Sequence, residues 1–130
     1  MKKLLVLLFS ILILPFSVYA SDVYYCVEDD SIGFDPNKNF EKMNYSEDKY
    51  KIMIDFENKK ITSNDILMNP SRVNQTCSYD AVHSTLYCSN MLGKVFSINE
   101  INLRFIYGKI YNRVDLTDDI FISYGTCDKF

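Results

Sequence analysis

The sequence contains little of what most enzyme active sites and metal centres use. Its 130 residues include one histidine, four glycines, three prolines and no tryptophan. His83 is the single imidazole, and the motifs of serine hydrolases, zinc proteases and glycine-rich phosphate loops are absent. A pair of carboxylates acting on a glycan is the enzyme hypothesis that remains. The composition therefore favours a non-catalytic protein without a metal or a cofactor.

Long apolar runs are missing from the chain except at its beginning. Lys2 and Lys3 precede an apolar stretch over residues 4–16, and Val18 and Ala20 are the small residues that a signal peptidase recognises. The stretch is shorter than the roughly 20 residues of a membrane-spanning helix. We therefore predict a signal peptide over residues 1–20, and a periplasmic or secreted mature chain without a membrane span.

Positive charge is also scarce. Removal of the leader, with its two lysines, leaves twelve basic and seventeen acidic residues, a net charge of −5. This balance excludes a nucleic-acid binder that depends on electrostatic attraction to phosphates. The remaining residues 21–130 suit one domain, since compact domains commonly have about 100–150 residues. The partner that we expect is an unidentified protein or small ligand, and the oligomeric state is open.

Four cysteines are present, and their spacing decides between a metal site and disulfides. The chain has no C-x-x-C pair, and only His83 could complete a zinc site. An even number of cysteines in a small exported domain is typical of disulfide bonds. We therefore predict that all four cysteines form disulfides.

Alternation of apolar and polar residues recurs along the mature chain. A turn is predicted at residues 29–31 with a return strand at 32–34, a loop or short helical turn at 37–48, and a bend at Gly108. Seven or eight short strands about ten residues apart predict an all-β antiparallel meander, either a small barrel or a sandwich. The main strands are expected at residues 23–28, 50–56, 61–63, 76–80, 85–89, 94–98, 102–107 and 119–127.

The expected strand pairing also predicts which cysteines are joined. Across a hairpin loop at residues 81–84, Cys77 lies directly opposite Cys88, within bridging distance. Closure of a barrel pairs the first strand with the last and brings Cys26 beside Cys127. The sequence therefore predicts the disulfides Cys77–Cys88 and Cys26–Cys127.

Polar clusters offer few other sites. We expect His83 to be an exposed residue at the tip of its hairpin. Residues 35–41 alternate like the start of a calcium loop, but Phe40 replaces the sixth-position glycine and Ser46 the twelfth-position glutamate. The acidic turns at residues 28–30 and 118–119 are the remaining candidates for weak binding of a cation.

Tyrosine is abundant, with ten residues, and two interpretations are open. Several tyrosines could line a ligand-binding mouth, because their rings combine apolar and polar contacts. Core packing, together with the codon bias of an A/T-rich genome, also accounts for such rings, and it is the interpretation that we favour. The tyrosines considered for a mouth are Tyr24, Tyr25, Tyr107, Tyr111 and Tyr124.

Several segments resemble a group of short exported proteins, without assigned function, from marine bacteria with A/T-rich genomes. These segments are residues 24–26, 33–36, 53–59, 84–88, 118–120 and 124–127. The resemblance spans nearly all of the mature chain and implies no activity.

A second resemblance is to the periplasmic inhibitors of C-type lysozyme, which are small barrels. Their opening aromatic-x-Cys strand corresponds to Tyr24, Tyr25 and Cys26, and their closing cysteine to Cys127, but their Ser-Gly-x-x-Tyr loop is absent. The leading hypothesis is therefore an exported, non-catalytic β-barrel that serves as a binding or structural module. The alternatives are an inhibitor of a lysozyme-type hydrolase and a carboxylate-dependent glycan-acting enzyme.

Overall fold

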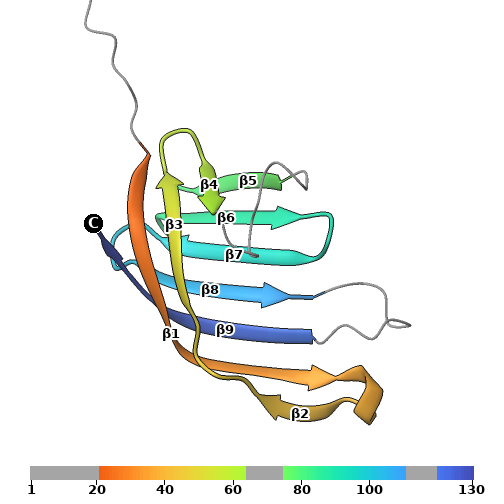
Figure 1. Ribbon diagram of the computed structural model, residues 1–130. Helices are drawn as coiled ribbons and strands as arrows, with labels where there is room; N and C mark the ends of the chain where they lie inside the picture. Colours follow the sequence, from red (N-terminus) through yellow and green to blue (C-terminus); the bar gives the residue numbers. More distant parts are fainter. Residues whose placement is uncertain (1–20, 64–74, 111–119) are drawn as a thin grey trace, which may run out of the picture.

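The chain forms one antiparallel sheet in a computed structural model that describes residues 21–63, 75–110 and 120–130 (Figure 1). Eight strands follow the order β4-β3-β1-β9-β8-β7-β6-β5 and make a nearly closed barrel, while β2 pairs with β1. The predicted signal peptide lies outside the described residues. The strands are β1 (Asp22–Asp35), β2 (Glu41–Asn44), β3 (Lys49–Asp55), β4 (Lys60–Ser63), β5 (Gln75–Asp80), β6 (Thr85–Asn90), β7 (Lys94–Asn99), β8 (Arg104–Lys109) and β9 (Ile120–Lys129).

The strand order confirms the predicted all-β meander. From β5 to β9 each strand pairs with the next one along the chain, and β3 pairs with β4 in the same way. The first and last strands, β1 and β9, are neighbours, as barrel closure requires, and β4 and β5 stand at the two ends of the order. Of the two predicted architectures, the barrel is therefore the one that forms.

Strand β1 runs through the corner of the barrel. Its first half pairs with β3 and its second half with β2, while β9 pairs with both halves. Figure 1 shows β1 passing from the layer of β3 and β4 into the layer that contains β9. A β-bulge between Glu28 and Asp30 shifts the register and bends the strand there. The predicted turn at residues 29–31 is therefore wrong, because one partner strand, β9, holds both halves in the same direction.

The segment after β1 is only partly as predicted. A short 3₁₀ helix over Pro36–Lys38 supplies the helical turn, and the Asp35 carboxylate accepts a hydrogen bond from the Asn37 backbone at 2.9 Å. The rest is not all loop, because β2 pairs with the end of β1. This strand has no alternation to reveal it, since its side chains are mostly exposed, and it pairs with β1 through the backbone.

The observed hairpin registers and strand bounds match the predicted ones to different extents. The β5–β6 register is confirmed pair by pair, from Asp80 opposite Thr85 to Cys77 opposite Cys88. Strand β8 begins two residues later than predicted, and Gly108 lies inside it, opposite Ile122 of β9. The expected bend at Gly108 is therefore wrong, because pairing on both sides keeps this strand extended.

The core occupies the middle of the barrel and consists mainly of aromatic and branched side chains. Phe96 and Phe105 stack with their ring centres 5.5 Å apart, and Tyr50 meets Phe105 and Tyr107 edge-on at 6.2 and 6.1 Å. The buried apolar residues are Tyr24, Cys26, Tyr50, Ile52, Ile54, Ile61, Leu86, Cys88, Phe96, Ile98, Phe105, Tyr107 and Cys127.

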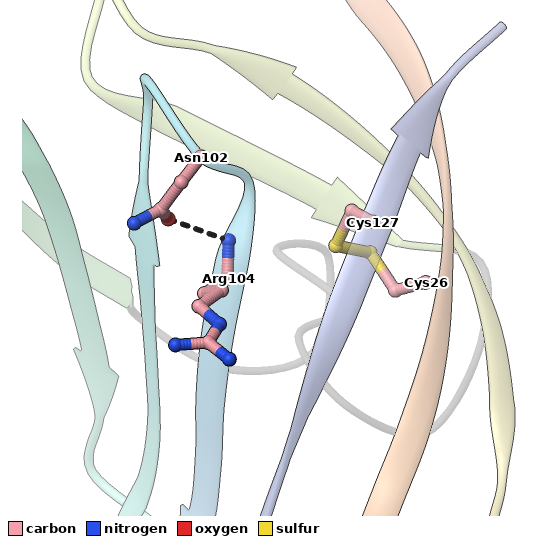
Figure 2. The surroundings of a disulfide bond; sticks show 4 residues. All are labelled: Cys26, Asn102, Arg104 and Cys127. Atoms are coloured by element: carbon pink, nitrogen blue, oxygen red, sulfur yellow. Dashed lines mark hydrogen bonds between the residues drawn. A yellow bond between two sulfur atoms is a disulfide. The ribbon is translucent and has the colours of Figure 1, made fainter.

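Both predicted disulfides are confirmed. Cys26 and Cys127 face each other across β1 and β9 with their Cα atoms 3.9 Å apart, and Figure 2 shows the bond between these two strands. Cys77 and Cys88 face each other across β5 and β6, with Cα atoms 4.1 Å apart. One bond thus joins the two ends of the meander, and the other joins a single hairpin.

Candidate functional site

His83 lies where the sequence placed it, at the exposed tip of the β5–β6 hairpin. Its Nδ1 atom is 2.7 Å from the Asp80 carboxylate, which also accepts hydrogen bonds from the backbone of Val82 and His83. The hydrogen bond to His83 is the main reason why the pKa of Asp80 lies below its ordinary value. These contacts order the hairpin loop.

Four of the five tyrosines considered for a ligand mouth are described, and they do not gather in one place. Tyr24 and Tyr107 point into the core, whereas Tyr25 and Tyr124 are exposed on the outside of the barrel. Tyr111 lies outside the described residues. The four described tyrosines therefore do not line one mouth together, since alternation along β1, β8 and β9 sends them to opposite faces of the sheet.

The fold divides the first acidic turn, residues 28–30, between the two faces of the sheet. Glu28 points into the barrel, while Asp29 and Asp30 are exposed on the outside. The second acidic turn, residues 118–119, lies outside the described residues. Within the described ranges, no three histidine, cysteine, aspartate or glutamate side chains gather in a way that could hold a metal ion.

Glu28 is an acidic side chain in the core, next to the bulge in β1. It is 3% exposed; its carboxylate accepts hydrogen bonds from the Tyr50 hydroxyl and, at 3.0 Å, from the Asp48 backbone. The backbone of Glu28 donates in return to the Asp48 carbonyl, also at 3.0 Å. These bonds satisfy a polar group that would otherwise be costly to bury, so the cluster fixes the corner between β1 and β3.

This cluster changes the titration of the tyrosines around it. Burial, followed by the hydrogen bond and charge of Glu28, raises the pKa of Tyr50 far above its ordinary value. Burial and the charge of Glu28 raise the pKa of Tyr107 in the same direction. Both phenols are therefore held in the neutral form inside the barrel.

We expect the folded protein to lose stability above about pH 10, the pKa of an unfolded tyrosine. Above that pH the unfolded chain ionises Tyr50 and Tyr107 while the folded chain keeps their protons. The free energy of unfolding should then fall by up to about 1.4 kcal/mol per pH unit for each tyrosine. Urea denaturation between pH 9 and 11 measures this slope. Tyr107→Phe should make it shallower, and an unchanged slope in that variant would contradict the assignment.

A second polar group lies at another end of the barrel interior. Lys94 of β7 is directly opposite Lys109 of β8, and both are half-buried. Each lies two residues along its strand from a buried ring, Phe96 or Tyr107, so alternation directs both lysines to the inward face. Burial, followed by the charge of Lys109, lowers the pKa of Lys94.

Aromatic and polar groups adjoin this lysine pair. Phe121 of β9 is directly opposite Lys109, and its ring meets the Tyr107 ring edge-on at 5.2 Å. Ser123 is the next inward-facing residue of β9 after Phe121. It is 1% exposed, and its hydroxyl has no hydrogen-bond partner in the described part of the chain. We call the inward-facing group Lys94, Lys109, Phe121, Tyr107 and Ser123 the lysine end.

Comparison with protein-family models, with curated proteins and with solved structures finds no match to this chain. Function must therefore be argued from the chemistry of its own residues. Among the residues that the structure describes, no helix is long and apolar enough to cross a membrane.

Sequence reasoning missed both the Glu28 cluster and the lysine end. Alternation alone was a usable signal, because Glu28 continues the inward series of Tyr24 and Cys26. Lys94 likewise belongs to the series of Phe96 and Ile98. An ionisable residue in an inward series is the feature that could have drawn attention to these places.

Proposed function

We propose that the protein is an exported, non-catalytic binding module that holds a small amphipathic anion at the lysine end. The observation that carries this proposal is the placement of Lys94 directly opposite Lys109 on the inward face of the barrel. Both side chains are half-buried. A charge-assisted hydrogen bond from a lysine to an anionic group is stronger where water is partly excluded.

The neighbours of the lysines support an apolar body for the ligand. Phe121 and Tyr107 present rings beside Lys109, and the Ser123 hydroxyl offers a buried donor one position deeper. Binding sites for small molecules commonly combine apolar and aromatic walls with a few polar groups, and barrel mouths are a frequent location. A carboxylate or sulfonate attached to an alkyl or aromatic group has the matching chemistry.

Export and the absence of catalysis are parts of the same proposal. The predicted signal peptide and the two disulfides support an oxidising compartment. His83 is engaged with Asp80 at an exposed hairpin tip, and the Glu28 carboxylate is engaged with Tyr50 in the core. Neither arrangement supplies a nucleophile with an adjacent base, which covalent catalysis requires.

Calorimetric titration with decanoate tests the ligand class. We expect saturable binding of decanoate by the mature protein and at least tenfold weaker binding of decanol, which has the same chain without the charge. Lys94→Met and Lys109→Met should each weaken decanoate binding about tenfold, the loss of one charge-assisted contact. Methionine keeps the length and apolar character of the lysine side chain, so the barrel should remain folded.

A matched control is Lys51→Met, which removes a lysine from the exposed face of β3 and should leave decanoate binding unchanged. Three results would overturn the proposal: no saturable binding of decanoate, equal binding of decanol, or equal losses in Lys51→Met and Lys94→Met.

A further inference from the structure

The outside of the barrel carries an apolar surface over β1, β8 and β9. Ile106 and Tyr124 are each 52% exposed, and Ile122 is 48% exposed. Pairing places them together: Ile122 is opposite Ile32 on one side and Gly108 on the other, and Tyr124 is opposite Ile106. We call the outward-facing residues Ile32, Phe34, Ile106, Ile122 and Tyr124 the outer face. An apolar surface of this kind commonly marks a site of association.

The geometry points to a second copy of this chain as the occupant of the outer face, related by a two-fold axis that runs along β9. Such an axis lays β1 of one copy over β8 of the other, because these strands flank β9 on opposite sides. Sheets packed face to face keep their strands within about 30° of each other, so residues of the same row come into contact.

The residues paired side by side with Ile122 across the three strands are complementary in shape to the same residues of a second copy placed by this axis. It contains a bulky side chain, Ile32, on β1 and no side chain, Gly108, on β8. Among the described residues, the near neighbour of a Cβ atom built at Gly108 is the Phe121 carbonyl oxygen, at 3.5 Å, and Gly108 itself is buried. Under this axis each Ile32 lies over Gly108 of the other copy, where no side chain projects, and this happens twice in a two-fold pair.

The charges beside the outer face are complementary in the same sense. Arg104 on β8 is opposite Thr126, and Asp30 on β1 is opposite Tyr124, one outward row along β9. After the rotation, Arg104 of one copy lies about 7 Å along the strand direction from Asp30 of the other, within reach of an arginine side chain. The pair forms twice. A bilayer with anionic lipids fits less well, because Asp29 and Asp30 border the outer face.

Sedimentation velocity over a series of micromolar concentrations tests the pairing. We expect the mature protein to be a dimer and Ile122→Lys to weaken dimerisation at least tenfold. The matched control is Ile101→Lys, at an 80% exposed position in the turn between β7 and β8, which should remain dimeric. A monomeric mature protein, or equal behaviour of the two variants, would overturn the inference.

Exchange of the two charges tests the axis itself and does not depend on the apolar variants. Arg104→Asp alone and Asp30→Arg alone should each weaken dimerisation, since each places like charges together across the interface. The double variant should restore it towards the level of the mature protein. Failure of the double variant to recover, with both single variants folded by circular dichroism, would refute the two-fold arrangement along β9.

Discussion

Removal of the Cys26–Cys127 disulfide should lower the free energy of unfolding by about 4.7 kcal/mol, the chain-entropy value for a loop of about 100 residues. The bond spans 101 residues and joins the first strand to the last, so its loss frees almost the whole described chain in the unfolded state. The measurement is urea denaturation of the variant with Cys26→Ala and Cys127→Ala.

The second disulfide provides the matched comparison. Cys77–Cys88 spans 11 residues, and the same relation gives about 3 kcal/mol for a variant with Cys77→Ala and Cys88→Ala. Both bonds join directly opposed residues of neighbouring strands, so the two variants differ chiefly in loop length. Equal losses in the two double variants would contradict the loop-length account. Peptide mapping of the non-reduced protein should show the same two pairs.

The success of the disulfide predictions has a local cause and a topological cause. The register of the β5–β6 hairpin follows from the length of its loop, so Cys77 had to face Cys88 once both strands were placed. Cys26 and Cys127 meet because a closed meander pairs its first and last strands. Both inferences need only the order and spacing of strands, which alternation indicates well.

The errors arise where backbone pairing overrides side-chain patterns. Residues 29–31 have the composition of a turn, but β9 holds the chain extended and only a bulge remains. Strand β2 is mostly exposed, so no alternation marks it. Gly108 has the composition of a bend and yet lies between two pairing strands. At each of these three places the conformation of the backbone is set by pairing with a strand that is distant in the sequence. The local sequence therefore does not predict it.

At the lysine end, too, one feature is predictable from the local sequence and another is not. That Lys94 and Lys109 point inward follows from alternation along their own strands. That they face each other depends on the β7–β8 register, which is set by the turn after Asn99. In that turn the Asn99 side chain accepts hydrogen bonds from the backbone of Ile101 and Asn102, and Leu103 adopts a positive φ of 55°. A strand that began at Asn102, as the sequence predicts, would have given Lys94 a different partner.

The bulge in β1 requires a glycine on the neighbouring strand, and Gly125→Ala should therefore destabilise the protein by about 3 kcal/mol or more. A Cβ atom at Gly125 would lie 2.0 Å from the Val27 carbonyl oxygen and 2.8 Å from the Phe105 ring. Two backbones would have to separate at the corner of the barrel. The bulge would move with them, and Glu28 would lose its alignment with the Tyr50 hydroxyl.

Gly108→Ala is the control, because it makes the same change on the neighbouring strand. Among the described residues, the added methyl group there would meet the Phe121 carbonyl oxygen, at 3.5 Å, which is an ordinary contact. Alanine restricts the unfolded chain more than glycine does, so this variant should gain about 0.5 kcal/mol. Both variants are compared by urea denaturation at concentrations where their oligomeric states are the same. A change in the free energy of unfolding as small in Gly125→Ala as in Gly108→Ala would mean that the corner can widen without breaking the β1–β9 pairing.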